Sequence, residues 1–258
     1  MKRLKNNEQR GSKPRCHWLT HGTREQVGRR LTELAQPWGT VSADDYWLPE
    51  GFCRRDEARL DKEPGLLPEA EHREALCDWW LEVPHSNANT PNFDIASTCK
   101  VGCEKGLLLV EAKAHAAELT KARKSLSAGA SEDSRKNHKR IGKAIEEVNA
   151  ALRADTGLCW QLSRDRCYQM SNRFAWSWKV ATLEYPVILV YLGFLNAQEM
   201  GTPFASHDKW EALVKKHSRC LFPPGQVWGQ RVRGRDRADF IPCICSRELR
   251  HDAPMADG

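Results

Sequence analysis

The sequence lacks any apolar run long enough to cross a membrane. A membrane-spanning helix needs about 20 consecutive apolar residues, and the longest run in these 258 residues covers only 186–195. That length suits a buried strand instead. The first ten residues are basic but lead into no apolar segment, which is not the pattern of a secretion signal. We therefore expect a cytoplasmic protein with no membrane partner.

The sequence also lacks the paired Cys-x-x-Cys spacing of most structural zinc sites, although it contains ten cysteines. Without a secretion signal, most of these cysteines are expected to be reduced thiols that pack as small hydrophobic groups. One alternative remains open at this stage, namely a zinc site that combines Cys99 and Cys103 with His85 or His115. No internal repeat is present.

What the sequence does contain is the composition of a globular protein with a mildly basic surface. Hydrophobic residues make up 40% and charged residues 29%, and the net charge is +6. This length is sufficient for one sizeable core with additions at its ends. A mildly basic balance is compatible with a polyanionic partner but does not require one.

Several helices can be predicted from local patterns. Thr23 and Gln26 have capping-box spacing ahead of an apolar stripe. Pro68 has the character of a first helical residue, and a run of apolar residues at helical spacing begins at Ile141. The expected helices begin at Thr23 and Pro68, follow Ile141, and cover 161–183 and 206–217, while 186–194 is expected to be an interior strand and 226–232 with 240–245 a hairpin.

Residues 91–115 contain the most informative pattern in the chain. Asp94 lies in a short apolar run, a polar turn-like segment follows at 97–106, and four aliphatic residues at 107–110 then lead into Glu111-Ala112-Lys113. Such an aliphatic run, bounded by glycine and charge, predicts a buried strand. Alternate side chains of a strand share a face, so Glu111, Lys113 and His115 are expected together. Two carboxylates and an ammonium group at the ends of paired strands would form a site for a hard divalent cation.

This arrangement resembles the PD-(D/E)xK nuclease superfamily, in which a strand carrying Asp pairs with a strand carrying Glu-x-Lys. The matching residues are Asp94, Glu111 and Lys113. Two features depart from the pattern: Phe93 replaces the frequent proline before the aspartate, and the Gln-x-x-x-Tyr helix of the exonuclease branch is missing. The resemblance implies an α/β protein with a restriction-endonuclease-like mixed central sheet flanked by helices.

The resemblance also implies an activity, which is Mg²⁺-dependent phosphodiester hydrolysis, with DNA favoured over RNA and Mn²⁺ able to substitute. Asp94, Glu111 and the backbone carbonyl of Ala112 would hold the metal, and Lys113 would orient or deprotonate water or stabilise the transition state. An additional acid can come from the preceding helix, and we rank Glu82 ahead of Glu71 and Glu74.

Polar residues near this segment are candidates for contacting nucleic acid. The loop before Asp94 is rich in asparagine, and the predicted helix 161–183 has a polar stripe, with Arg173 placed to reach a phosphate. Turn formation in the loop and an exposed polar helix face are the alternative explanations. The candidate contacts are Asn89, Asn92, His115, Gln169, Asn172 and Arg173.

The predicted organisation follows from these elements. We expect a flexible basic arm at 1–15, a helical and loop extension at 16–66, a nuclease core at 67–200 with a mobile basic segment at 121–140, a C-terminal helix and hairpin at 201–250 and a disordered tail at 251–258. A Glu-x-Lys triplet is common in charged proteins. The alternative function is therefore a non-catalytic nucleic-acid-binding or scaffold protein that retains the fold.

Overall fold

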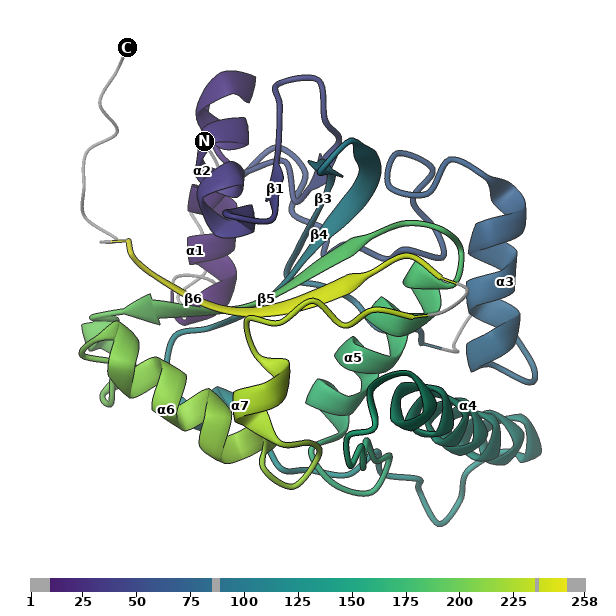
Figure 1. The fold of residues 1–258 in the computed structure, drawn as a ribbon. Coiled ribbons are helices and arrows are strands. Elements are labelled where there is room, and N and C mark those ends of the chain that lie inside the picture. Colours follow the sequence, from purple (N-terminus) through teal and green to yellow (C-terminus); the bar gives the residue numbers. More distant parts are fainter. Residues whose placement is uncertain (1–9, 85–88, 235–236, 250–258) are drawn as a thin grey trace.

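A single mixed sheet lies at the centre of the structure, a computed structural model that describes residues 10–84, 89–234 and 237–249 (Figure 1). Its strands follow the order β1-β3-β4-β5-β6, and β2 also pairs with β3. β3 is antiparallel to β4, whereas β4, β5 and β6 run parallel. The strands are β1 (Gly39–Thr40), β2 (Trp47–Leu48), β3 (Ile95–Val101), β4 (Glu104–Lys113), β5 (Val187–Leu195) and β6 (Phe240–Glu248).

Helices cover both faces of this sheet, which confirms a mixed α/β architecture (Figure 1). One face packs against the N-terminal pair, α1 (Ser12–Leu19) and α2 (Arg24–Ala35). The other face packs against the remaining helices. These are α3 (Ala70–Trp80), α4 (Glu132–Thr156), α5 (Tyr168–Ala181), α6 (His207–Ser218) and the short α7 (Pro224–Val227), and two 3-10 turns lie at Ala116–Glu118 and Gln198–Met200.

The predicted interior strand at 186–194 is confirmed as β5. It lies between β4 and β6, and its side chains alternate between the two cores. Val187 and Leu189 pack with α3, α4 and α5, whereas Ile188 and Val190 pack with α1 and α2. A strand that is covered on both faces needs apolar side chains at every position, which explains its continuous aliphatic sequence.

Three helices follow their local sequence signals. Thr23 caps α2 in a complete capping box with Gln26, and Ser206 caps α6 by accepting a hydrogen bond from the N–H of Lys209. The apolar stripe that begins at Ile141 forms the buried face of α4. These signals depend on residues three or four positions apart, so they can be read without knowledge of the tertiary contacts.

The polar segment at 97–106 is not a turn, contrary to our prediction. β3 pairs with β4 along its whole length, from Ile95↔Val110 to Val101↔Glu104. The chain reverses within two residues, at Gly102, whose φ of +62° is a conformation that glycine adopts without steric cost. Polar residues are tolerated inside β3 because they have partners; for example, the Thr98 hydroxyl donates a 2.6 Å hydrogen bond to Asp45.

Three other predicted segments were also wrong in part. Within the expected arm at 1–15, the described residues from Ser12 onward belong to α1. Arg15 is buried there, with its Nη1 2.5 Å from Oε1 of Glu199. Within the expected mobile segment at 121–140, α4 already begins at Glu132, where Ser131 provides an N-cap. The expected helix at 161–183 begins only at Tyr168. Residues 1–9 and the tail after 249 lie outside the described residues.

The expected C-terminal hairpin is also corrected. Residues 240–245 belong to β6, a nine-residue strand that pairs in parallel with β5. Among the described residues, the two predicted hairpin segments are joined by one β-bridge, which is between Val232 and Phe240. No helix in the described part of the chain is long and apolar enough to cross a membrane.

Candidate active site

The structure places Asp94 and Glu111 next to each other on adjoining chain segments. Asp94 immediately precedes β3, and the register Ile95↔Val110 puts it opposite Glu111 on β4. One carboxylate oxygen of Asp94, Oδ2, accepts a 2.7 Å hydrogen bond from the backbone N–H of Ala112. This bond fixes the aspartate at the end of the hairpin, because Ala112 is the residue that follows Glu111 on β4.

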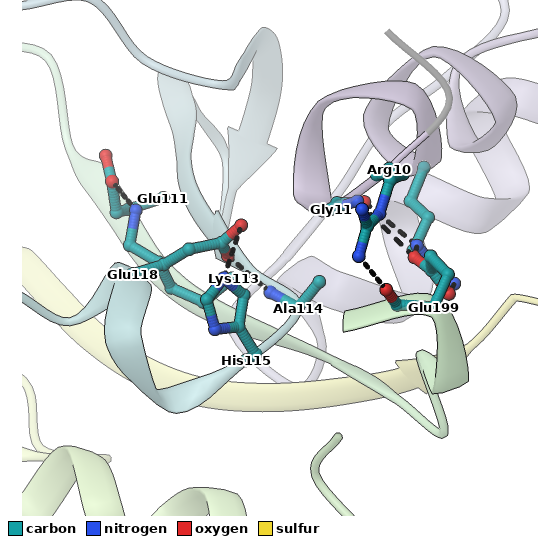
Figure 2. Close-up of polar contacts among 9 residues, drawn as sticks. Arg10, Gly11, Glu111, Lys113, Ala114, His115, Glu118 and Glu199 are labelled. Atoms are coloured by element: carbon teal, nitrogen blue, oxygen red, sulfur yellow. Dashed lines mark hydrogen bonds and ion pairs between the residues drawn. The ribbon is translucent and has the colours of Figure 1, made fainter. Parts of the chain in front are cut away.

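Glu111 is bound by two cations, one on each carboxylate oxygen. Its Oε1 accepts a hydrogen bond from the ammonium group of Lys113, two residues along the same strand (Figure 2). Its Oε2 accepts a 2.5 Å hydrogen bond from Nε of Arg173 on α5. Arg173 also donates to Asn172 at 2.6 Å and lies over the ring of Phe93, 5.0 Å from its centroid.

These charged groups are almost completely shielded from solvent. The exposed fraction is 1% for Glu111, 5% for Lys113 and 7% for Arg173, whereas Asp94 is partly exposed. A buried charge is tolerated when an opposite charge offsets its loss of hydration. Two carboxylates and two cations meet here, so the cluster is electrically balanced when all four groups are ionised.

The two carboxylates nevertheless have different acidities. Burial alone would raise the pKa of Glu111, but the positive charges of Arg173 and Lys113 lower it below its ordinary value. Burial and then repulsion by Glu111 raise the pKa of Asp94 from 3.8 to about 7, against the smaller opposing effect of Lys113. Asp94 is therefore the carboxylate that is least stable in its charged form, and an additional cation at this position would favour its ionisation.

A tyrosine that the sequence analysis missed completes this cluster. Tyr191 on β5 is the register partner of Glu111, and burial, followed by the charge of Glu111, raises the pKa of its phenol well above the ordinary value. The hydroxyl is buried, and no partner for it lies among the residues that the structure describes. Nothing in the sequence distinguishes this tyrosine from its apolar neighbours, because only the pairing of β4 with β5 brings it to Glu111.

The predicted polar helix stripe is mostly internal. Asn172 and Arg173 are buried, which excludes an exposed stripe at these positions, and Gln169 is half-buried on the same helix. Arg173 binds Glu111 rather than facing outward to a phosphate. An arginine becomes an internal counter-ion where the opposing strand offers an ionised carboxylate, and that strand is 62 residues away in sequence.

The other predicted contact residues have their neighbours outside the carboxylate pair. Asn92 donates a 3.2 Å hydrogen bond to Glu57, which also pairs with Lys13 at 3.2 Å. His115 lies 3.8 Å from Glu118, whose carboxylate also accepts from the N–H of Ala114 (Figure 2). Asn89 is exposed and lines a cavity of about 300 Å³ beside Lys124 and α4. Neighbouring residues 85–88 lie outside the described residues.

Glu82 is not brought to the carboxylate pair as a ligand. It is exposed and follows α3, next to Val83, whose backbone bonds with the Asn137 side chain on α4. The negative charge of Glu82 acts on Lys136. Glu82 is not among the main charges that set the pKa of Asp94 or Glu111.

The donor set fits a magnesium ion better than a zinc ion. Asp94, Glu111 and the carbonyl of Ala112 are oxygen donors, and Mg²⁺ needs few protein ligands because it retains several waters.

Across residues 10–84, 89–234 and 237–249, no group of three His, Cys, Asp or Glu side chains could hold a metal. Cys99 is buried in the core beneath α1 and α2 while Cys103 is exposed, and His85 lies outside the described residues. A cation at Asp94 would have to compete with Lys113 or Arg173 for Glu111.

Comparisons of the chain with protein-family models, with curated proteins and with solved structures found no match.

Proposed function

We propose that this protein is a magnesium-dependent nuclease that hydrolyses phosphodiester bonds, with DNA as the favoured substrate and Mn²⁺ able to replace Mg²⁺. The observation that carries the proposal is the position of two carboxylates and one ammonium group at one end of the β3–β4 hairpin. Asp94 and Glu111 lie opposite each other there, and Lys113 follows two residues later on the same strand. A strand segment carrying Asp that pairs with a strand carrying Glu-x-Lys is also what the PD-(D/E)xK resemblance implies.

The candidate site residues would have different roles, because their environments differ. Asp94, Glu111 and the Ala112 carbonyl would hold the metal, which when bound polarises a phosphoryl oxygen and acidifies bound water. Lys113 is nearly buried, and although burial opposes its charge, Glu111 and Asp94 raise its pKa above the ordinary value. It therefore serves as a fixed positive charge beside the reacting phosphate rather than as a neutral base.

Arg173 supports this arrangement from the opposite side. Its bond to one oxygen of Glu111 fixes the carboxylate plane, while Lys113 occupies the other oxygen. With a cation held by Glu111, Lys113 would turn from this carboxylate toward the substrate, while Arg173 would keep its bond to Oε2. Glu111 remains ionised throughout, because Arg173 continues to neutralise it within the interior.

The same ion pairs support a second candidate function. Glu111 has both oxygens occupied and is 1% exposed, which is also the arrangement of a purely structural buried ion pair. A protein with this site could bind nucleic acid, or act as a scaffold, without turnover. The two functions differ in one measurable property, which is metal-dependent cleavage.

Plasmid cleavage in the presence of Mg²⁺ or Mn²⁺ tests the proposal, with chelator as the blank. The informative variants are Asp94→Asn and Lys113→Met. Lys105→Met provides a matched control, since Lys105 lies on the same strand but is exposed near its start. We expect wild type and the control to cleave and both site variants to lose cleavage. Equal background in all four proteins would refute the nuclease and leave the non-catalytic function.

A further inference from the structure

Two cysteines that are far apart in sequence have their sulfur atoms in contact. The Sγ atoms of Cys167 and Cys220 are 3.5 Å apart, across 53 residues of chain. Cys167 is the N-cap residue of α5, and Cys220 follows the end of α6. All ten cysteines of the protein are free thiols in this structure. The two thiols therefore bring the start of α5 into contact with the segment that follows α6.

We propose that Cys167 and Cys220 form a reversible disulfide bond when the protein meets a hydroperoxide. The Cys220 sulfur attacks one peroxide oxygen, the O–O bond breaks, and Cys220 becomes a sulfenic acid while an alcohol or water leaves. The Cys167 sulfur then attacks the Cys220 sulfur, forming the S–S bond and releasing water. In total, two thiols lose two electrons and two protons, and the hydroperoxide is reduced to alcohol and water.

The surroundings of the two thiols assign their roles in this sequence. Cys220 is partly exposed and can meet an oxidant, whereas Cys167 is buried. Burial, and then the hydrogen bond and charge of Cys220, raise the pKa of the Cys167 thiol to about 12. The positive charges of Lys121 and Arg166 oppose this rise only weakly. A partly exposed thiol is the one that oxidants reach first, and a buried thiol in contact with it can then resolve it.

The distance that the sulfur atoms must close is small. A disulfide needs an S–S separation of about 2.05 Å, so the two atoms must approach by roughly 1.5 Å. Cys167 is held in place, because its N–H donates a 3.1 Å hydrogen bond to the carbonyl of Lys121. Cys220 lies in the connection between α6 and α7, so rotation of its side chain and a small shift of this connection can supply the movement.

The bond would join the start of α5 to the segment that follows α6, and both helices carry a residue that interacts with a charged group of the candidate active site. α5 carries Arg173, which binds Glu111. The charge of Cys167 also affects Tyr191, the register partner of Glu111. On α6, His217 is buried within range of the charge of Lys113, and burial followed by Lys121 and Lys113 lowers its pKa. Formation of the bond itself does not depend on the proposed nuclease function, although any effect on cleavage does.

Peptide mapping of the full-length protein without reduction tests the proposal. Native protein treated with a stoichiometric amount of hydrogen peroxide should yield a linked peptide containing Cys167 and Cys220, with the mass loss of two hydrogen atoms and reversal by a thiol reductant. Peroxide treatment of the urea-unfolded protein is the control for chance pairing. Cys53, Cys103 and Cys159 are exposed and serve as internal competitors that should not form the dominant link.

Two variants separate the roles of the sulfurs. In Cys167→Ala the resolving thiol is missing, so a sulfenic-acid-specific diketone reagent should label Cys220 more than in wild type. Cys220→Ala should show no such labelling at Cys167, and Cys53→Ala should behave as wild type does. Circular dichroism identifies any variant that fails to fold. If folded native protein gives no Cys167–Cys220 link, or forms the link no more often than the unfolded protein does, the proposal is wrong.

Discussion

Replacement of Asp94 by asparagine should remove the proposed nuclease activity and at the same time stabilise the fold at neutral pH. Asparagine retains the size of the side chain and an oxygen that can accept the bond from the N–H of Ala112. It removes the negative charge that opposes Glu111. The two consequences are linked, because a site prepared for a cation stores repulsion until the cation binds.

The size of the stabilisation expected for Asp94→Asn follows from the pKa of Asp94. Its pKa rises from 3.8 to about 7 on folding, chiefly through burial and repulsion by Glu111. A carboxyl whose pKa is raised binds its proton more tightly in the folded state. Its stabilising contribution is therefore complete below pH 3.8 and is lost as the pH rises toward 7. At about 1.4 kcal/mol per pKa unit, and with an allowance for the partial exposure of Asp94, the loss amounts to roughly 2–4 kcal/mol.

Urea unfolding at pH 4, 6 and 8 measures this effect. Wild type and Asp94→Asn should have similar free energies of unfolding at pH 4, and the variant should be more stable by about 2–4 kcal/mol at pH 8. Asp44→Asn, which removes an exposed carboxylate, is the control and should show no growing difference. Addition of Mg²⁺ at pH 8 should stabilise wild type but not Asp94→Asn. A variant that is equally or less stable at pH 8 would refute the reasoning.

Substitutions at three further positions address the neighbouring interactions and one helix cap. Arg173→Met leaves Glu111 on β4 without its counter-ion from α5 and should lower the free energy of unfolding in urea by about 3–5 kcal/mol. Arg173→Lys should lose less, and equal losses would mean that the charge is unimportant here. Tyr191→Phe removes a buried hydroxyl that has no partner among the described residues, so stability should remain within about 1 kcal/mol of wild type or increase; a larger loss in thermal melting would reveal a hidden partner. Thr23→Ala removes the N-cap of α2 and should lower the free energy of unfolding in urea by about 1 kcal/mol, whereas Thr23→Ser should retain most of the stability. If both variants are as stable as wild type, this cap does not stabilise the protein.

The sequence by itself determined the elements whose signals are local. The aliphatic run at 107–110 predicted β4, because four consecutive apolar residues need burial on both faces. The capping box at Thr23 and the apolar stripe after Ile141 predicted α2 and α4. Asp94, Glu111 and Lys113 could be identified as a group because the period of a strand and the short distance between two strands constrain them strongly.

Only the tertiary structure decided the contacts between distant segments. Arg173 was identified as a polar helix residue, but its buried partner Glu111 lies 62 residues earlier. Tyr191 and the thiol pair of Cys167 and Cys220 likewise become significant only through the packing of separate elements. The spacing of apolar residues in the sequence indicates which face of a helix or strand is buried. The partner of a buried charge depends instead on which elements pack together. That choice reflects the free energy of the whole core rather than any local pattern.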